Sequence, residues 1–318
     1  MVGWEAGNPS MSILYRSDEP RAAAWASYFA KHAPDLDFQV WPDARDLRKI
    51  EYLIAWQVPP EFLTELPRLK VLFSSGAGTD HIDFSTVPAH IPIVRMVEPG
   101  IIDGMVEYVS LAVLALHRDF FDYVAAKSAR IWSPLEVPPA STRTIGVMGM
   151  GILGRAVLER LATYGFRLRG WNRSLRHMNG VESFAGTDQL QRFAEGCNVL
   201  VCLLPLTPAT RGILSCQLFS ALPAGAAVVN VGRGQHLVNP DLLAALDSGR
   251  LSRAILDVTD PEPLPPEHPF WTHTRIFLTP HVASMTQPET AAAILLENIR
   301  RHQRGEPLRD VIDRSRGY

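Results

Sequence analysis

Short apolar runs alternate with helix-like stretches along most of the chain. Runs rich in Val, Ile, Leu and Phe with helices between them are typical of parallel strands that are covered on both faces. The pattern occurs twice, which predicts an α/β protein of two doubly wound domains with parallel sheets. The predicted strands cover 12–15, 37–41, 52–56, 70–75 and 91–95 in the first set, and 144–149, 167–171, 198–205, 226–231, 254–258 and 275–280 in the second.

Two helical stretches are expected to pass between the two domains. Residues 103–132 space their apolar positions as one long helix would, and we expect this helix to pass from one domain to the other. The tail from Gln287 is also helical, and it is expected to return to the first domain. We therefore predict a substrate domain over 11–99, completed by 286–318, and a nucleotide domain over 100–285. The fold prediction begins at Met11 and assigns no role to residues 1–10.

Composition narrows the class of function. With 318 residues, 47% of them hydrophobic, the chain can bury a large core, and its net charge of −2 provides no basic field for nucleic acid or an anionic membrane. No apolar run comes near the ~18 residues of a membrane span, and the N-terminus does not resemble a secretion signal. The three cysteines form no CxxC pair, so we predict neither a zinc site nor a disulfide. These features favour a cytoplasmic protein with small-molecule chemistry and no metal.

A glycine-rich turn follows the run at 144–148 and precedes a good helix. Glycines in this setting permit a tight turn, close approach of backbone to a pyrophosphate, and close packing of helix and strand. The strand before it and the helix after it favour a dinucleotide site over an ordinary glycine turn. The predicted cofactor-binding turn is Gly149, Met150, Gly151, Ile152, Leu153 and Gly154.

The next strand ends in "RGWNRSLR", where NAD-binding proteins usually carry an acid for the ribose hydroxyls. Asn172 stands near that position and cannot repel a 2′-phosphate, while Arg173 and Arg176 can offer forked donors and Ser174 a hydroxyl. This predicts NADP(H) as the preferred cofactor, with NAD(H) as a possible second. Two surface arginines on a solvated loop are the alternative.

Three later segments each place a reactive side chain just after a predicted strand. Arg233 can clamp a carboxylate, His281 can donate a proton near neutral pH, and a carboxylate such as Glu262 beside it would favour its charged form. Each residue alone would be an ordinary loop residue, but reduction of a keto acid needs these three roles together. We predict that Arg233, Glu262 and His281 are catalytic.

A second glycine-rich turn lies in the first domain. Gly76, Ala77 and Gly78 follow a predicted strand and can expose backbone NH groups to a substrate carboxylate. An ordinary turn between strand and helix explains this sequence equally well.

Together these segments resemble the D-isomer-specific 2-hydroxyacid dehydrogenase family, from the first strand to the C-terminus. Within the family the chain is most similar to the glyoxylate/hydroxypyruvate reductase A group. The family motifs are the turn at 149–154, "LLPLTPATRGIL" at 203–214, "NVGRG" at 230–234, "LLAALDSGRLSRAILDV" at 242–258, "EPLPPEHPFW" at 262–271 and "TPHVAS" at 279–284; the group is indicated by "AWQVPPEFL" at 55–63, "GAGTDHI" at 76–82, "MVEY" at 105–108, "WNRS" at 171–174 and "DRSRGY" at 313–318.

The resemblance implies a Rossmann-like nucleotide domain, a flavodoxin-like substrate domain with a cleft between them, and a homodimer joined mainly through the nucleotide domains. It also implies that Arg233 binds substrate, that His281 does acid/base work supported by Glu262, and that Trp56 closes over small substrates. Cofactor contacts are implied for Pro205, Val231 and Asp257, the last at the nicotinamide amide. Thr259 and the stretch 96–98 depart from the common family pattern, which leaves the substrate preference open.

The expected activity is NADPH-dependent reduction of a small 2-keto acid, glyoxylate or hydroxypyruvate. One alternative is an NAD(P)-dependent dehydrogenase of another D-2-hydroxy acid. The motif "WNRS" argues against the NAD-dependent form of this alternative. The other is a nicotinamide-sensing regulatory protein, as some relatives of this fold are. The complete trio Arg233, Glu262 and His281 favours the enzyme.

Overall fold

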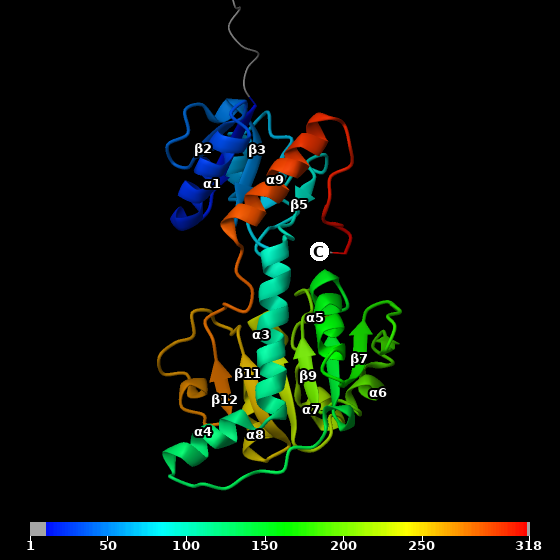
Figure 1. Ribbon diagram of the computed structural model, residues 1–318. Coiled ribbons are helices and arrows are strands. Elements are labelled where there is room, and N and C mark those ends of the chain that lie inside the picture. The colour runs from blue at the N-terminus through cyan, green and yellow to red at the C-terminus, as the bar shows by residue number, and fades with distance from the viewer. Residues whose placement is uncertain (1–10, 317–318) are drawn as a thin grey trace, which may run out of the picture. The chain divides into compact units, whose positions relative to one another are not determined.

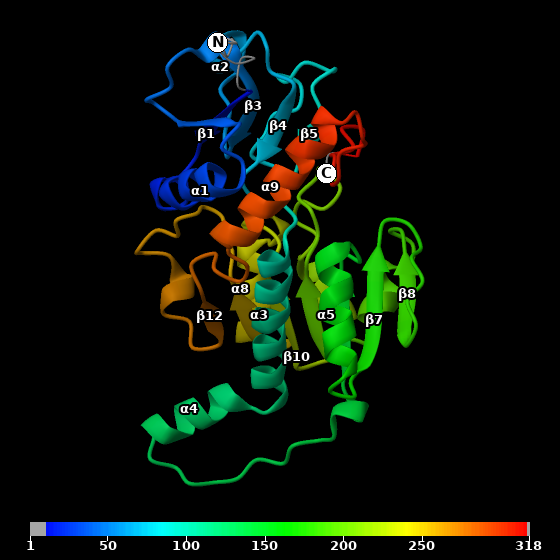
Figure 2. The ribbon, with the colours of Figure 1, turned by 45° about the horizontal axis from the view of Figure 1, so that its top comes forward.

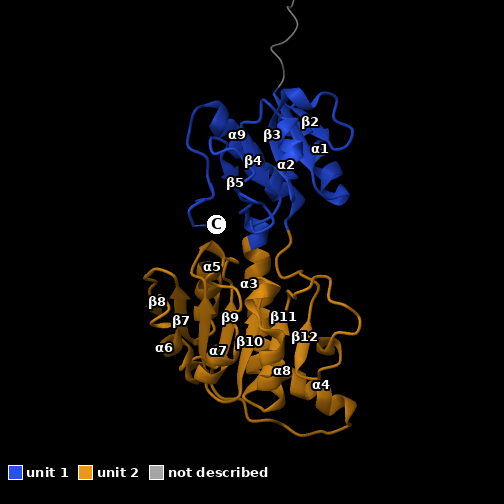
Figure 3. Ribbon diagram, turned by 180° about the vertical axis from the view of Figure 1, so that it is seen from behind, with its two compact units in different colours: residues 1–101, 286–318 blue, residues 102–285 orange. Residues whose placement is uncertain are grey.

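The chain folds into two compact units, described here from a computed structural model of residues 11–316. Unit 1 contains the chain up to Ile101 and from Thr286 onward, and unit 2 runs from Ile102 to Met285 (Figure 3). The chain therefore passes twice between units, after Ile101 and after Met285. The domain boundaries predicted from the sequence are 99/100 and 285/286. Residues 1–10 and the last two residues of the motif at 313–318 lie outside the described residues.

Unit 1 is built on a five-stranded parallel sheet in the order β2-β1-β3-β4-β5. This is the strand order of flavodoxin-like folds. The C-terminal helix α9 packs beside α1 (Figure 1). The elements are β1 (Ser12–Arg16), α1 (Glu19–His32), β2 (Asp37–Val40), β3 (Ile50–Ala55), α2 (Pro60–Thr64), β4 (Val71–Ser74), β5 (Ile93–Val94) and α9 (Pro288–Gln303).

Unit 2 is built on a seven-stranded sheet in the order β12-β11-β10-β9-β6-β7-β8, again all parallel. The order runs outward in both directions from β6, as in Rossmann folds, and the reversal beside β6 is where such sheets bind ligands. The elements are α3 (Pro99–His117), α4 (Phe120–Ser128), β6 (Thr144–Met148), α5 (Ile152–Ala162), β7 (Arg167–Asn172), β8 (Val181–Ala185), α6 (Leu190–Ala194), β9 (Val199–Cys202), α7 (Cys216–Ala221), β10 (Ala226–Asn230), α8 (Asn239–Asp247), β11 (Leu251–Leu256) and β12 (Ile276–Leu278).

Both faces of the unit 2 sheet are buried, which explains why its strands read as continuous apolar runs. Along β9, Val199 and Val201 pack into the core under α3 and α5, whereas Leu200 and Cys202 pack into the opposite core with α6, α7 and α8. Successive side chains of a strand point to opposite faces, so each face needs its own apolar set. The predicted fold of two parallel-sheet α/β domains is confirmed.

The predicted single helix over 103–132 is wrong. Helix α3 ends at His117 and α4 begins at Phe120, and Asp119 between them has a φ of 51°, which interrupts the helical path. After α4 the chain runs without regular structure to residue 139 (Figure 2). Apolar spacing alone could not detect this break, because the apolar positions continue through it.

The apolar pattern of the sequence does not predict strand β8. This strand lies at the edge of the unit 2 sheet, and of its five residues only Phe184 is buried. With a single buried side chain, the alternation of apolar and polar residues is too weak to indicate a strand.

The expectation that no stretch reaches the length of a membrane span is also corrected. Among the described residues, α3 alone is long and apolar enough to cross a membrane by length and composition. Its residues Met105, Val109, Ala112 and Val113 are buried in the core of unit 2. They belong to the buried third of its apolar window, whereas Leu111 is 69% exposed.

Candidate active site

The predicted catalytic residues of unit 2 follow three neighbouring strands at their carboxyl ends. Arg233 follows β10, Glu262 follows β11 and His281 follows β12, and these strands are adjacent in the sheet. The glycine turn follows β6 at the same edge, because all the strands are parallel. The sheet thus gathers residues separated by more than a hundred positions along the chain.

His281 and Glu262 form a direct pair. The imidazole Nδ1 lies 2.6 Å from Oε1 of the carboxylate, and both side chains remain partly exposed, at 37% and 42%. When Nδ1–H donates to Glu262, the imidazole is held in one orientation and Nε2 is left to face a substrate. The arrangement suits a proton donor whose position and tautomer are fixed by a carboxylate.

The loop that carries His281 is held by Asp257. Its carboxylate, 2% exposed, accepts hydrogen bonds from the backbone N–H of Val282 at 2.8 Å and of Ala283 at 2.9 Å. Its backbone carbonyl accepts the N–H of His281, also at 2.8 Å. His281 itself adopts a φ of 55°, a left-handed conformation that is uncommon for histidine and needs such support.

A half-buried tyrosine, Tyr108, extends this support. Thr279 Oγ1 donates to Asp257 Oδ1 at 2.7 Å, and the hydroxyl of Tyr108 lies 2.5 Å from the same Thr279 oxygen. Because the single hydroxyl proton of Thr279 goes to the carboxylate, Tyr108 is the donor in its own bond. Burial raises the pKa of Tyr108 to about 12, so this donor keeps its proton. Helix α3 is thereby linked to the loop of His281.

The turn that carries Arg233 is held by a buried histidine. His236 is fully buried; its Nδ1 accepts the backbone N–H of Arg233 at 3.0 Å, which leaves Nε2 to donate to the carbonyl of Pro205 at 3.3 Å. The guanidinium of Arg233 donates to the carbonyl of Gly232 at 2.7 Å. Val231, just before this turn, is buried and donates its N–H to Cys202. His236 thus joins the loops after β9 and β10, which contain Pro205 and Arg233.

The turn after β6 has the steric features of a phosphate-binding turn. Gly149 has a φ of 102°, and a side chain on Gly154 would clash with the carbonyl of Gly149. A side chain at Gly151, in contrast, would meet nothing within 4 Å. The backbone is therefore closely packed where helix meets strand and open where a pyrophosphate would approach the N-terminus of α5.

The segment 172–176 leads from the neighbouring strand toward this turn. Asn172 is the last residue of β7, and its side-chain amide donates to the carbonyl of Ser174 at 3.2 Å. Arg176 Nη1 donates to the carbonyl of Met150 at 3.3 Å, within the glycine turn. Arg173, Ser174 and Arg176 are exposed. Two guanidinium groups thus stand on the loop where a ribose-binding acid would end the strand.

In unit 1 the candidate substrate-binding residues follow β3 and β4, which are adjacent. Trp56 comes directly after β3, and Gly76, Ala77 and Gly78 come shortly after β4. The indole of Trp56 is 38% exposed and its Cζ3 lies only 2.6 Å from where a Cβ of Gly76 would be. The structure therefore brings the predicted Trp56 and the predicted turn into contact within this unit.

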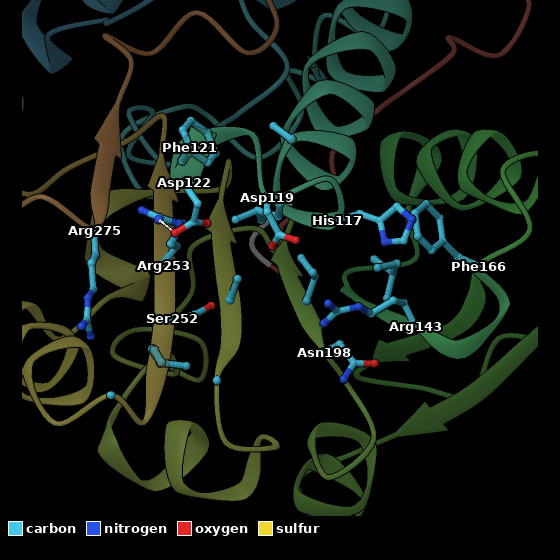
Figure 4. A pocket seen from close by; sticks show the side chains of 18 residues that line it. His117, Asp119, Phe121, Asp122, Arg143, Phe166, Asn198, Ser252, Arg253 and Arg275 are labelled. Atoms are coloured by element: carbon cyan, nitrogen blue, oxygen red, sulfur yellow. Dashed lines mark hydrogen bonds and ion pairs between the residues drawn. The ribbon is translucent and has the colours of Figure 1, made fainter. Parts of the chain in front are cut away.

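A cavity of about 440 Å³ lies elsewhere in unit 2, at the amino ends of the strands. It lies between the end of α3 and the starts of β6, β9, β10, β11 and β12, at the opposite end of the sheet from His281 (Figure 4). Its labelled lining residues are His117, Asp119, Phe121, Asp122, Arg143, Phe166, Asn198, Ser252, Arg253 and Arg275. None of the predicted site residues contributes to it.

Comparison with known proteins places this geometry in a family. Residues 110–283 match the family model described as D-isomer specific 2-hydroxyacid dehydrogenase, NAD binding domain. The glyoxylate/hydroxypyruvate reductase A of Yersinia enterocolitica is 38% identical over 314 residues, covering 97% of this chain and 100% of that protein. The chain belongs to the D-isomer-specific 2-hydroxyacid dehydrogenase family. This confirms the resemblance noted in the sequence, and it makes the protein a dehydrogenase by family.

Solved structures of this dehydrogenase family have the same fold. A D-isomer specific 2-hydroxyacid dehydrogenase of Xanthobacter autotrophicus Py2, in complex with NADPH and MES, matches with a TM-score of 0.92 at 35% identity, covering 97% of this chain and 100% of that one. An NADPH-dependent glyoxylate/hydroxypyruvate reductase of Sinorhizobium meliloti, in complex with NADP and sulfate, matches with a TM-score of 0.91 at 35% identity and the same coverage. Both relatives were solved with the phosphorylated nicotinamide cofactor.

Two supporting residues of this dehydrogenase were missed in the sequence. The sequence assigns no role to His236, although its position three residues after Arg233 is the spacing at which a side chain can cap the turn. Tyr108 lies in the quoted "MVEY", but no local signal connects it to Thr279, 171 positions away. The family resemblance implies only a cofactor contact for Asp257, whereas the structure shows its carboxylate holding the loop of His281.

Proposed function

We propose that this dehydrogenase reduces small 2-keto acids with NADPH, converting glyoxylate to glycolate and hydroxypyruvate to D-glycerate. The observation that carries the proposal is the pair of His281 Nδ1 and Glu262 Oε1 at 2.6 Å, on the sheet edge that also carries Arg233 and the glycine turn. A fixed proton donor, a cation for a carboxylate and a dinucleotide turn are the three parts that keto-acid reduction requires.

The cofactor would be held by residues of unit 2. We assign its pyrophosphate to the backbone of residues 149–154, where the exposed backbone at Gly151 leaves room for it. Arg173 and Arg176, with Ser174, would bind the 2′-phosphate through charge-assisted hydrogen bonds, and Asn172 presents no opposing charge. Pro205, Val231 and Asp257 are assigned to the remaining cofactor contacts. The NADPH complex of one structural relative and the NADP complex of the other support this choice of cofactor.

NADPH, when bound, supplies a hydride to the keto carbon of the substrate. We assign His281 as the general acid that donates its proton to the keto oxygen, so that hydride and proton together give the 2-hydroxy acid and NADP⁺. Glu262 would orient the imidazole through its contact with Nδ1, which leaves Nε2 to face the substrate. Arg233 would bind the substrate carboxylate and polarise the carbonyl, because its guanidinium can fork onto two oxygens. In unit 1, we assign the backbone N–H groups of Gly76, Ala77 and Gly78 to substrate binding, and Trp56 would close over small substrates.

We further propose that the enzyme is a homodimer. The segment that follows α3 is unusually apolar for a surface: Trp132 is fully exposed, and Phe120, Ile131 and Leu135 are 58%, 59% and 44% exposed. Exposed apolar patches of this kind mark interaction sites, and a second copy of the chain is the partner that the family resemblance implies. Light scattering after size exclusion tests this: the wild type should have twice the chain mass, and Trp132→Glu should have the mass of one chain. A monomeric wild type contradicts it.

A cytoplasmic location is proposed from the chemistry of the cysteines. Cys197, Cys202 and Cys216 are free, and burial raises the pKa of the first two thiols to about 12, so they stay protonated and unreactive.

Small 2-keto acids are the partners we propose, with no nucleic acid and no membrane.

Steady-state assays with purified protein test the central proposal. Oxidation of NADPH and of NADH is followed with glyoxylate, hydroxypyruvate, pyruvate and phenylpyruvate, and the configuration of the product is determined. We expect turnover with NADPH and the two small acids, and D-glycerate from hydroxypyruvate. Arg233→Lys should raise KM for the acids more than it changes NADPH binding, because an ammonium cannot form the forked contact. NADPH binding without any turnover would favour a nicotinamide-sensing regulator instead, and efficient turnover with NADH alone would favour another D-2-hydroxyacid dehydrogenase.

A further inference from the structure

The indole of Trp56 lies flat on the imidazole of His81. The ring centroids are 3.7 Å apart and the planes are inclined by 12°. Trp56 follows β3 and His81 lies in the loop after β4, so two neighbouring parallel strands deliver the two rings to the same edge of the unit 1 sheet. Imidazole and indole at this separation form a stacked pair, which restricts rotation of the tryptophan side chain.

The imidazole is anchored by a buried serine. Nε2 of His81 lies 3.3 Å from Oγ of Ser74, which is fully buried. The same hydroxyl accepts the N–H of Gly76 at 3.3 Å and lies 3.0 Å from the carbonyl of Gly76 and 3.3 Å from that of Gly78. One hydroxyl group therefore ties His81 to the turn proposed to bind the substrate carboxylate.

The edge of the indole completes the arrangement. Because Cζ3 of Trp56 occupies the space beside Gly76 where a Cβ would stand, the ring is confined by that turn on its edge and by His81 on its face. Trp56, Ser74, Gly76 and His81 thus form one connected group, called here the Trp56 cluster.

We infer that His81 is a positioning residue that fixes the plane of Trp56 and thereby restricts the enzyme to 2-keto acids with small side chains. The inference rests on the proposed function, since it gives the selectivity of the same site. A tryptophan free to rotate would accept longer groups on the keto carbon and would hold glyoxylate and hydroxypyruvate less well. A tryptophan fixed beside the carboxylate-binding turn sets an upper limit on that group. His81 acts through Trp56 and is assigned no contact with substrate.

Two substitutions separate stacking from hydrogen bonding. His81→Phe keeps a flat ring under the indole and loses the contact with Ser74, whereas His81→Ala loses both. For His81→Ala we expect KM for glyoxylate and hydroxypyruvate to rise by roughly two- to tenfold, the range of an aromatic pair energy, with kcat little changed. The ratio of kcat/KM for glyoxylate to that for phenylpyruvate should fall by a similar factor. His81→Phe should stay near the wild type in this ratio.

A double-mutant cycle with Trp56→Ala shows whether His81 acts through the indole. Once Trp56 is removed, His81→Ala should change selectivity no further, whereas additive effects would overturn the inference. The matched control is His32→Ala, because His32 stacks on Tyr28 in the same unit with centroids 4.4 Å apart and lies at an exposed position of α1. It should leave both KM values unchanged.

A readout without catalysis separates this inference from the proposed function. Protein labelled with 5-fluorotryptophan gives ¹⁹F resonances for its seven tryptophans, and Trp56→Phe identifies the one of interest. We expect that resonance to move in His81→Ala and to stay close to its place in His81→Phe, while the others report an intact fold. An unmoved resonance, or an unchanged substrate ratio in His81→Ala, overturns the role of His81. A different outcome is a wild type without keto-acid turnover combined with a shifted Trp56 resonance in His81→Ala. This outcome would overturn the proposed function and leave the stacked pair established.

Discussion

His281 Nδ1 and Glu262 Oε1 lie 2.6 Å apart, although the two residues come from the ends of different strands and are 19 positions apart. The loop of His281 is fixed from a second side by Asp257, whose carboxylate and carbonyl both accept backbone N–H groups of that loop. A histidine in a left-handed conformation is therefore held by the carboxylate of Glu262 at its ring and by the backbone carbonyl of Asp257 at its own N–H.

Replacement of His281 by glutamine should abolish most turnover. General-acid help is commonly about 10²–10⁴ in rate, so we expect kcat to fall by that order while the Kd for NADPH stays within about twofold. Stopped-flow reduction and fluorescence titration measure the two quantities. His273→Gln is the matched control, since His273 Nε2 also pairs with a carboxylate, that of Asp247 at 3.2 Å, elsewhere in unit 2. A variant of His281 with full kcat would refute the assignment.

The double variant Arg173→Ala, Arg176→Ala should lose its preference for NADPH over NADH. Each charge-assisted bond to a phosphate contributes about 1.5–3 kcal/mol, so the ratio of the kcat/KM values for the two cofactors should fall at least tenfold. Arg155→Ala, Arg160→Ala on exposed positions of α5 removes the same charge and should leave the ratio unchanged. If the first variant keeps the preference, the 2′-phosphate is bound elsewhere.

Tyr108→Phe removes a hydroxyl that donates to Thr279 and so supports Asp257. We expect a loss of about 1 kcal/mol in the free energy of unfolding and a decrease of kcat on the order of threefold to tenfold, because the loop of His281 becomes less well fixed. Urea unfolding and steady-state kinetics measure both effects. Tyr164→Phe, at a partly exposed tyrosine just after α5, should change neither. An unaltered kcat in Tyr108→Phe would confine the network to a structural role.

Glu98→Gln should destabilise unit 1. The fully buried carboxylate of Glu98 accepts N–H bonds from Gly100 and Ile101 at the start of α3, and from Gln287 next to α9, as well as the hydroxyl of Thr290. An amide has one oxygen in place of two, and its NH₂ group cannot accept a hydrogen bond. The donors that face the NH₂ group would therefore lose their acceptor. We expect a loss of about 3 kcal/mol, measured by urea unfolding. Glu61→Gln, on the surface of α2, is the control, and an equal stability of the two variants would contradict the capping role.

A pH dependence of stability should come from His302. Burial, with a smaller effect of Lys70, lowers the pKa of His302, whose Nδ1 lies 3.0 Å from the hydroxyl of Tyr52. The unfolded chain therefore takes up this proton at a higher pH than the folded one, so the contribution to stability is present above about pH 6.5 and is lost as the pH falls toward the lowered pKa. His302→Gln should show a smaller fall of Tm between pH 7.5 and 5.5 than the wild type. The control is His32→Gln, at an exposed histidine, whose Tm should fall as much as that of the wild type. An equally large fall of Tm in His302→Gln would contradict the contribution of His302.

Local sequence was sufficient to predict the glycine turn and most strands. The roles of Gly149 and Gly154 depend on backbone sterics within a few residues, and buried parallel strands such as β9 are continuous apolar runs. The break at Asp119 and the edge strand β8 could not be predicted, because the apolar spacing continues through the first and only one buried residue marks the second. Glu98, noted in the sequence only as a departure from the family pattern, caps the starts of two helices that are far apart along the chain.

The sequence by itself determined the class of the protein: two α/β domains, a glycine-rich turn between strand and helix, a strand end with arginines in place of an acid, and three candidate catalytic residues after strand ends. These features are local, so residue type and spacing are enough to indicate them. Tertiary structure decided which side chains meet, because contacts between distant segments depend on strand order and on the loops between strands. Only the folded sheet brings Glu262 to His281 and Tyr108 to Thr279, and only the neighbouring ends of β3 and β4 stack Trp56 on His81.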